Sequence, residues 1–359
     1  MITPSNNKLV SSVIVSIKVF AVAAVGIIVF SLLHLPMPWL LGSIFAVMIS
    51  QLTIKGAASW ELPKSLRNGA LIILGAAIGC AFTASAFSDM GVYVLYMLLL
   101  NILLILFCVL LSLMTMKLTG MSFMTAFTAS IPGGLSQSVA FAEEQQGIDL
   151  GTVTYFQVIR VLSVVSVVPF IVSGKLNVTA AETVATPLWQ LAIYLLLAYV
   201  AAVIAHRFKF PVAYFLAPVL VGIIINLVGI FDLALPDLLL HIAQLAIGAY
   251  IGLLLKPEMI KLPWKVLVAG LASCLVLLGF SYSCGLLLSE LLQLDIVTSF
   301  LSTAAGGMDQ MSLIAAALKV DATVVTVFQL FRLLFIYFVV FPLLHWLAGY
   351  QAHKTAIKE

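Results

Sequence analysis

The sequence predicts an all-α polytopic membrane protein made of two inverted-topology repeats, and three observations support this fold class. Of the 359 residues, 63% are hydrophobic and only 9% are charged, whereas soluble domains carry about 25% charged residues. Uncharged runs such as 92–116 and 266–289 exceed the ~20 residues that a helix needs to cross a bilayer. One glycine-rich motif also occurs twice, once in each half of the chain.

The two copies of this motif indicate an internal duplication. Residues 132–160 read PGGLSQSVAFAEEQQGIDLGTVTYFQVIR, and residues 305–332 read AGGMDQMSLIAAALKVDATVVTVFQLFR. Both contain a Gly-Gly pair, a Gln four residues after the first Gly, and later a Phe-Gln-x-x-Arg. We therefore expect a first transmembrane repeat at 1–176 and a second transmembrane repeat at 177–359.

The same register extends outside the motif. The sequences Gly75-Ala-Ala-Ile-Gly79 and Gly248-Ala-Tyr-Ile-Gly252 are 173 residues apart. Small residues four positions apart on a helix allow another helix to approach closely. We expect these two sequences at helix crossings.

Each repeat is predicted to contain about five ordinary transmembrane helices and one unusual segment. The ordinary spans are expected at 12–34, 37–54, 67–86, 91–116, 150–173, 188–206, 211–229, 237–255, 265–289 and 321–346. The unusual segments, 120–146 and 295–318, are each split by a Gly-Gly pair into arms of about 12 residues, which span ~18 Å as helix. Each is either one broken crossing or a re-entrant helical hairpin that returns to the side it came from.

The distribution of Lys and Arg favours the hairpin. If both unusual segments crossed, with the N-terminus cytoplasmic, eight basic loop residues would lie inside and six outside. If both segments were re-entrant, twelve basic loop residues would lie inside and two outside. This is the asymmetry that the positive-inside rule describes. Hairpins leave an odd number of crossings per repeat, so the second repeat would be inverted and both termini would be cytoplasmic. Inverted repeats are common in secondary transporters.

Both motif arginines are then expected near the middle of the membrane. Arg160 lies ten residues into its predicted helix, or about 15 Å at 1.5 Å per residue, and Arg332 is equally deep from the other side. The tips at 132–134 and 305–307 enter from opposite sides. Tips and arginines should therefore meet near one plane.

Candidate substrate-binding residues come from both copies of the motif. Glycine lets the backbone turn sharply and lets a ligand approach, and a polar side chain at this depth should face a partner or a wet cavity. Each arginine suits a carboxylate or similar anion through its planar fork; alternatively, each bonds hairpin carbonyls and locks the fold. The candidates are Gly133, Gly134, Ser136, Gln137, Gln157, Arg160, Gly306, Gly307, Gln310, Gln329 and Arg332.

One charged residue distinguishes the two tips. Asp309 stands in the second tip where the first has Ser136. A single carboxylate at this depth suggests an ion-coupling or proton site. The alternative is a structural ion pair of Asp309 with Arg332 or Arg160.

Catalysis has little support in the sequence. The five histidines are scattered without a metal-binding spacing, and no nucleotide-binding or nucleophile motif is present. We expect no enzyme activity, no metal, no cofactor and no nucleic-acid partner. Cys80, Cys108, Cys274 and Cys284 lie inside apolar runs without CxxC spacing, and we expect them to pack in the core.

The paired PGGLSQ and AGGMDQ tips, each followed by a Phe-Gln-x-x-Arg helix, resemble the bacterial AbrB family of duplicated inner-membrane proteins. The resemblance covers about 12–346. Family members are often labelled ammonia monooxygenases, and the name is shared with a soluble DNA-binding regulator; neither label fits a chain without clustered histidines or a DNA-reading domain. The resemblance implies an inner-membrane location and, for certain members, a link to regulation of gene expression. Ala305 replaces Pro132, so we expect the two tips to differ in rigidity.

These features predict a multi-pass inner-membrane secondary permease for a small anionic or zwitterionic molecule, working by alternating access around the two Gly-Gly tips. The alternative is a non-transporting membrane regulator or sensor that affects gene expression through a partner, although the short loops and the tail at 347–359 offer it little surface. The expected partners are the lipid bilayer and a small-molecule substrate. The sequence leaves open the substrate, the coupling ion, the transport direction and whether the chain forms a homo-oligomer.

Overall fold

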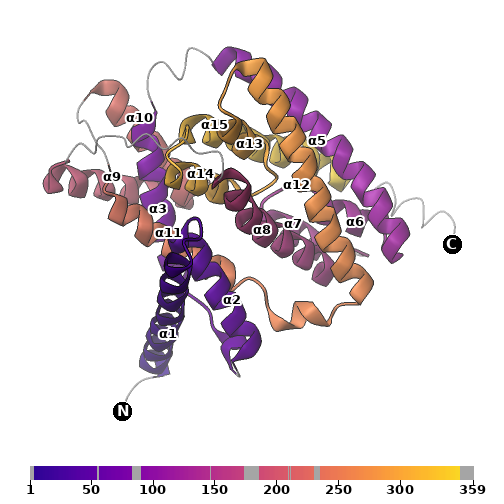
Figure 1. Cartoon of the computed structure of the whole chain (residues 1–359), viewed down its shortest axis with the longest axis horizontal. Coiled ribbons are helices and arrows are strands. Elements are labelled where there is room, and N and C mark those ends of the chain that lie inside the picture. The colour runs from indigo at the N-terminus through magenta and orange to yellow at the C-terminus, as the bar shows by residue number, and fades with distance from the viewer. Residues whose placement is uncertain are drawn as a thin grey trace. The chain divides into compact units, whose positions relative to one another are not determined.

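The secondary structure of the protein is helical, which confirms the predicted all-α class (Figure 1). The computed structural model describes residues 4–54, 56–82, 90–145, 147–173, 186–208, 210, 212–229 and 235–347. No strand occurs within these ranges. The predicted boundary between the repeats, at 176 and 177, lies outside them, as do both ends of the chain.

Each sequence half contains one interrupted helix pair in the described ranges, while the short π and 3₁₀ turns differ between the halves. The first half forms α1 (Pro4–Leu32), η1 (Pro38–Gly42), α2 (Ser43–Thr53), η2 (Ala57–Ser59), α3 (Lys64–Ala81), α5 (Met90–Thr119), α6 (Phe123–Ser130), α7 (Leu135–Glu144) and α8 (Leu150–Ser173). The second half forms α9 (Leu188–Arg207), α10 (Ala213–Val228), α11 (Asp237–Gly252), η3 (Pro257–Lys261), α12 (Trp264–Leu292), α13 (Ile296–Thr303), α14 (Met308–Ala317), α15 (Ala322–Phe335) and η4 (Ile336–Val340).

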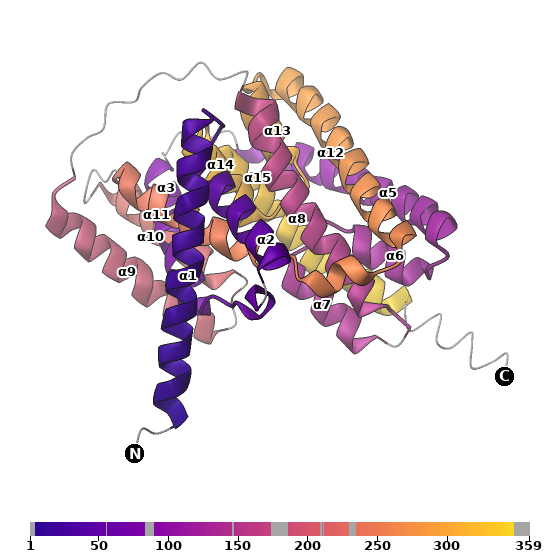
Figure 2. The same cartoon turned by 60° about the horizontal axis from the view of Figure 1, so that its bottom comes forward.

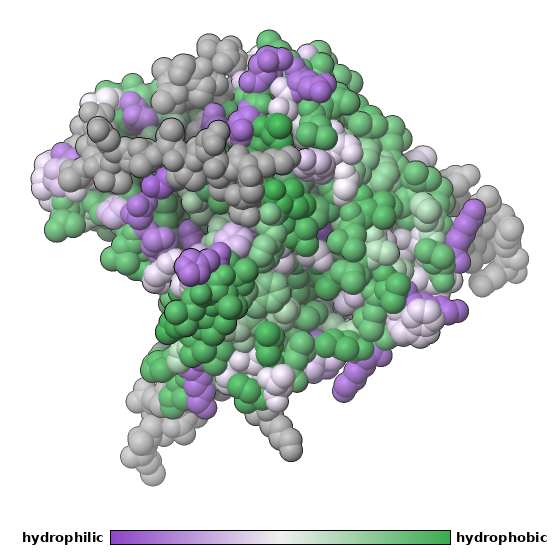
Figure 3. All heavy atoms as spheres, in the orientation of Figure 1, coloured by the Kyte–Doolittle hydropathy of each residue, from purple (hydrophilic) through white to green (hydrophobic). Residues whose placement is uncertain are grey.

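The helices have the length and apolar surface of a multi-pass membrane protein. Seven of the described helices are long and apolar enough to cross a bilayer: Ser12–Leu32, Gly91–Thr119, Leu150–Val172, Leu188–Arg207, Asp237–Lys261, Trp264–Leu292 and Ala322–Leu347. Helices α2, α3 and α10 are shorter, at 11, 18 and 16 residues. Apolar residues dominate the visible face over α1 and α12 in Figure 3. A surface of this kind suits lipid rather than water.

The helices are grouped into two compact units, and each unit takes segments from both sequence halves. The first unit contains Met1–Asp89, Val165–Pro257 and Ser312–Thr323. The second unit contains Met90–Val164, Glu258–Met311 and Val324–Glu359. The unit boundaries therefore differ from the repeat boundaries that the sequence predicts, because helices of one half pack on helices of the other half.

In the first unit, small residues allow close crossings between helices from different halves. Helix α3 packs along α10, and α11 packs on α2 and η1. A Cβ atom on Gly79 would lie 2.6 Å from Val219 O, and one on Gly252 would lie 2.7 Å from Ile44 O. The close contacts predicted from the two small-residue sequences are therefore confirmed.

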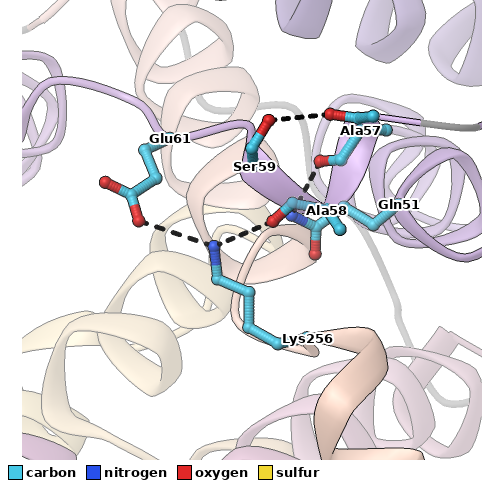
Figure 4. Close-up of polar contacts among 7 residues, drawn as sticks. Gln51, Ala57, Ala58, Ser59, Glu61 and Lys256 are labelled. Atoms are coloured by element: carbon cyan, nitrogen blue, oxygen red, sulfur yellow. Dashed lines mark hydrogen bonds and ion pairs between the residues drawn. The ribbon is translucent and has the colours of Figure 1, made fainter.

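Two surface ion pairs join loops of the first unit. Lys256 Nζ lies 3.6 Å from Glu61 Oε1 and donates to Ala58 O at 3.4 Å (Figure 4). Lys319 Nζ lies 3.9 Å from Asp237 Oδ2, at the opposite end of α11. Exposed ion pairs of this kind stabilise a fold by only about 0–1 kcal/mol. They nevertheless show which loops lie at the same end of the helices.

The second unit is built around α5 and α12, which lie side by side in Figures 1 and 2. Phe107 on α5 stacks on Phe280 of α12, with ring centroids 3.9 Å apart. Helix α6 packs on α5, and α13 packs on α12. One buried apolar cluster of this unit includes Cys108, Ile131 and Ala305. Ile131 and Ala305 come from the two helix interruptions, so both interruptions adjoin the same cluster.

The cysteines behave as packing residues, as the sequence predicts. Cys108, Cys274 and Cys284 are buried, Cys80 is half-buried, and all four are free thiols.

Both predicted helix interruptions are also present, at 131–134 and 304–307. The arms are 8 and 10 residues long in each pair, shorter than the predicted length, because the flanking loops take up several residues.

A pair of matched glycine substitutions tests the crossing of α3 with α10. We expect Gly79→Ala to lower the free energy of unfolding by about 1–3 kcal/mol, the usual cost of overpacking, because the new methyl group meets the backbone of α10. Gly69→Ala on the same helix has open space and should be neutral or stabilising by about 0.5–1 kcal/mol. Unfolding of both variants in mixed micelles measures the difference. Equal effects would contradict the close crossing.

Candidate functional site

The two helix interruptions lie in the second unit and create a hydrogen-bonding problem. The last four carbonyl groups of a helix have no partner within it, and α6 and α13 both end inside the protein. Every residue from Thr125 to Ile131 is buried, as is every residue from Thr298 to Ala305. Buried carbonyl groups without a partner are costly, so other side chains must supply donors.

In the first copy, Gln157 and Arg160 on α8 supply these donors. Gln157 Nε2 donates to three carbonyl oxygens at 3.2–3.3 Å, and Arg160 donates through both Nη atoms at 2.7 and 3.0 Å. The acceptors are the carbonyl oxygens of Thr128, Ala129, Ile131 and Gly133. Cys108 Sγ lies 3.5 Å from the remaining carbonyl oxygen, that of Ser130. Two side chains one helical turn apart thus cap the end of α6.

The second copy repeats this arrangement through Gln329 and Arg332 on α15. The acceptors are the carbonyl oxygens of Leu301, Ser302, Thr303, Ala304 and Gly306, at 2.7–3.4 Å. Arg332 Nη2 also donates to Gln329 Oε1. Four of these acceptors lie 173 residues after the four acceptors of the first copy. The duplicated sequence therefore makes a duplicated hydrogen-bond pattern.

The two guanidinium groups are buried cations that face partial negative charge. Arg160 and Arg332 are 3% and 5% exposed. The C-terminal end of a helix carries about −0.5 elementary charge, and the planar fork of arginine matches two carbonyl oxygens at once. In the described part of the chain, neither group has a carboxylate at salt-bridge distance. Of the two interpretations that the sequence leaves open, carbonyl bonding is present here; substrate binding stays a prediction.

The second glycine of each pair leaves room for a glutamine of the following helix. A Cβ atom on Gly134 would lie 2.9 Å from Gln137 Oε1, and one on Gly307 would collide with Gln310 Oε1. Gly133, Gly134, Gly306 and Gly307 all lie outside the left-handed backbone region. None of these four glycines therefore needs a left-handed conformation, and the small size of Gly134 and Gly307 is what the two glutamines require. Whether the Gly-Gly pairs also serve a sharp backbone turn stays a prediction.

The remaining predicted residues lie at the start of the returning helices. Asp309 is half-buried in the first turn of α14, where the helix dipole favours a carboxylate. The side chain of Ser136 lies outside the described part of the structure. Gln137 and Gln310 each bury an Oε1 atom that has no hydrogen-bond partner in the described residues. These two amide oxygens occupy matching positions in the two copies.

The two ends of the first interrupted pair lie together. Ser122 Oγ, before α6, donates to Gly147 O at 3.4 Å, and the Asp149 amide donates to Thr125 Oγ1 at 3.2 Å. Gln145 Nε2 also lies 3.4 Å from His345 Nδ1, beyond η4. The chain therefore leaves α7 near the point at which it enters α6.

A small cavity that the sequence did not predict adjoins Arg332. It has a volume of about 30 Å³, enough for one or two water molecules. Its polar lining residues are Asn101, Ser281, Ser302, Thr303 and Arg332. Asn101 and Ser281 lie within the long apolar runs of α5 and α12, and polar residues in such runs are the feature that could have indicated this cavity.

These observations define a class: an all-helical polytopic membrane protein with two interrupted helices, each capped by a buried arginine. The family model described as "Transition state regulatory protein AbrB" matches residues 39–348, and the chain belongs to the AbrB family. The resemblance inferred from the tips is thereby confirmed.

Two relatives cover most of this chain. It is 27% identical to "Putative regulator AbrB" of Escherichia coli K12, over 85% of this chain and 88% of that protein. It is also 27% identical to "Uncharacterized protein YhjN" of Bacillus subtilis 168, over 94% of each. The similarity therefore extends over both halves of the chain.

Removing one capping amide tests the importance of the cap. We expect Gln157→Met, which keeps the volume but removes the donor, to lower the free energy of unfolding by about 1–3 kcal/mol, because buried carbonyl groups lose their partner. Gln293→Met is the control, since Gln293 also donates to a backbone carbonyl but is exposed. It should change stability by less than about 0.5 kcal/mol. Equal losses would contradict the capping role.

Proposed function

We propose that the protein is a secondary permease of the bacterial inner membrane that carries a small anionic or zwitterionic solute. The observation that carries this proposal is the pair of interrupted helices in one unit, each with its C-terminal carbonyls held by a buried arginine. Secondary transporters bind substrates and coupling ions where helices are interrupted. Irregular backbone is tolerated at membrane depth only where protein covers it or a wet cavity reaches it.

We further propose that the two interrupted segments are re-entrant, in two inverted repeats. Full crossings would place Glu61 and Lys256 on opposite sides of the membrane, and likewise Asp237 and Lys319. Their ion pairs support the re-entrant arrangement, in which each pair shares a side. The contact of Ser122 with the chain after α7 supports it as well. Both chain termini would then be cytoplasmic.

The charge of the site supports an anionic or zwitterionic substrate. Two buried cations without a carboxylate partner in the described residues favour a ligand that brings negative charge. The unpartnered amide oxygens of Gln137 and Gln310 suit an ammonium group or a water molecule. A substrate would compete with hairpin carbonyls for Arg160 or Arg332, and such an exchange would loosen one tip and open the site to one side of the membrane.

Catalysis plays no part in this proposal, and neither does a metal or a cofactor. The name of the Escherichia coli relative describes a regulator. A non-transporting membrane regulator is therefore the alternative that the transport experiment below has to exclude.

Single cysteines test the re-entrant topology. In a background without the four native cysteines, we expect Glu61→Cys and Lys256→Cys to be labelled by a membrane-impermeant thiol reagent from the same side. Asp237→Cys and Lys319→Cys should be labelled from the other side. The side chains at the four positions are exposed or half-exposed. Labelling of Glu61→Cys and Lys256→Cys from opposite sides would contradict re-entrant hairpins.

Uptake into proteoliposomes tests transport and the coupling role of Asp309. We expect wild-type vesicles to accumulate at least one member of a panel of small carboxylates and amino acids under a proton or sodium gradient. Asp309→Asn should abolish gradient-driven accumulation but keep downhill equilibration, because the carboxylate is the proposed coupling group.

Asp295→Asn is the control, since Asp295 is an exposed N-cap of α13 and asparagine caps equally well. It should accumulate solute as the wild type does. If wild-type vesicles move no member of the panel under either gradient, the transport proposal fails and the regulator alternative gains.

A further inference from the structure

We propose that the charged group of the ligand, a small anion of carboxylate size, binds in the cavity beside Arg332, and that the first copy has no equivalent site. The inference deepens the proposed function because it assigns the anion site to one of two similar copies. It rests on a difference in lining residues between two copies that share four matching backbone acceptors.

The cavity lies inside the second unit, between α5, α12, α13 and α15. Its lining combines one full positive charge, from Arg332, with the polar side chains of Asn101, Ser281, Ser302 and Thr303. Each of these five residues is buried. The volume, about 30 Å³, exceeds what a single water molecule requires.

One lining group is a donor without a partner. Ser281 is 1% exposed, and its Oγ has no hydrogen-bond partner in the described residues. A buried hydroxyl that makes no hydrogen bond is costly, so a molecule in the cavity would relieve it. Because Ser281 lines the cavity that Arg332 also lines, its hydroxyl can donate to an anion held by the guanidinium charge.

The hydroxyls of Ser302 and Thr303 have already used their only donor hydrogen, and the Asn101 amide has used one of its two. The Ser302 hydroxyl donates to Thr298 O at 2.8 Å, and the Thr303 hydroxyl to Ser281 O at 2.8 Å. Asn101 Nδ2 donates to Met97 O at 2.7 Å. Their oxygen atoms remain as acceptors, which suits a water molecule that accompanies the anion. A cation would meet the positive charge of Arg332 at close range and be repelled.

The first copy lacks three of the four uncharged polar side chains of this lining. At the positions that correspond by the 173-residue register, Cys274 replaces Asn101, Cys108 replaces Ser281, and Ala129 replaces Ser302. Ser130 stands in place of Thr303. Cys108 is fully buried in an apolar cluster with its Sγ against Ser130 O. The arginine scaffold is duplicated, but the residues that match Asn101, Ser281 and Ser302 differ in the first copy.

Anion-dependent thermal unfolding of the full-length protein in detergent tests the inference. Sodium formate is the probe, and sodium gluconate at equal ionic strength is the reference. We expect formate to raise the unfolding temperature of the wild type in a saturable way. Ser281→Ala should weaken the apparent affinity by about tenfold, the effect of one hydrogen bond to a charged group, because the donor is removed while the cap on α13 is kept.

Cys108→Ala is the matched control, because it changes the corresponding position of the first copy. It should bind formate as the wild type does. A general salt effect would raise all three unfolding temperatures equally, and that result would overturn the site. Absence of any formate effect on the wild type would mean that the cavity holds water only, and would also overturn it.

The outcome is separable from that of the transport experiment. Formate binding that depends on Ser281, in a protein that moves no solute, would sustain the anion site and reject the permease. Transport without a formate effect would sustain the permease and reject the anion site. Arg332 itself is left unchanged in these variants, since its loss would also remove the cap on α13.

Discussion

The hydrogen bonds from Gln157 and Arg160, and from Gln329 and Arg332, to backbone carbonyls are the interaction on which the rest of the second unit depends. A helix that stops inside an apolar protein leaves several carbonyls without water to bind them. One amide and one guanidinium group supply enough donors to satisfy them. Without these bonds neither interruption could persist in the core, and no polar site could form beside it.

The spacing of the motif follows from this geometry. Residues three apart on a helix face the same direction, so the glutamine and the arginine approach one helix end together. The glutamine reaches carbonyls of the last turn and of the residue that follows it, and the arginine bonds to that same residue and to the first glycine of the pair. A lysine carries its donors on one nitrogen and has no planar fork, so it could not present two separate nitrogens to Ile131 O and Gly133 O as Arg160 does.

Much of this architecture could be predicted from the sequence, because hydropathy and duplication are local properties. The apolar runs predicted the helices, and the Gly-Gly pairs predicted the interruptions. Tertiary contacts decided the rest. The role of Gly134 and Gly307 depends on where Gln137 and Gln310 fold, and the grouping of helices depends on which small-residue faces meet. The cavity beside Arg332 was missed because Asn101 and Ser281 are far apart in sequence and neither belongs to the repeated motif.

The crossing of α3 with α10 has a consequence for biosynthesis. The glycine face of α3 is complete once Ala81 is made, but its partner begins at Ala213, roughly 130 residues later. At typical translation rates of about 5–20 residues per second, α3 must wait on the order of ten seconds in the bilayer before that partner exists. During this interval lipid or another helix must cover the glycine face of α3. The first half of the chain can therefore complete its packing only after the second half has been synthesised.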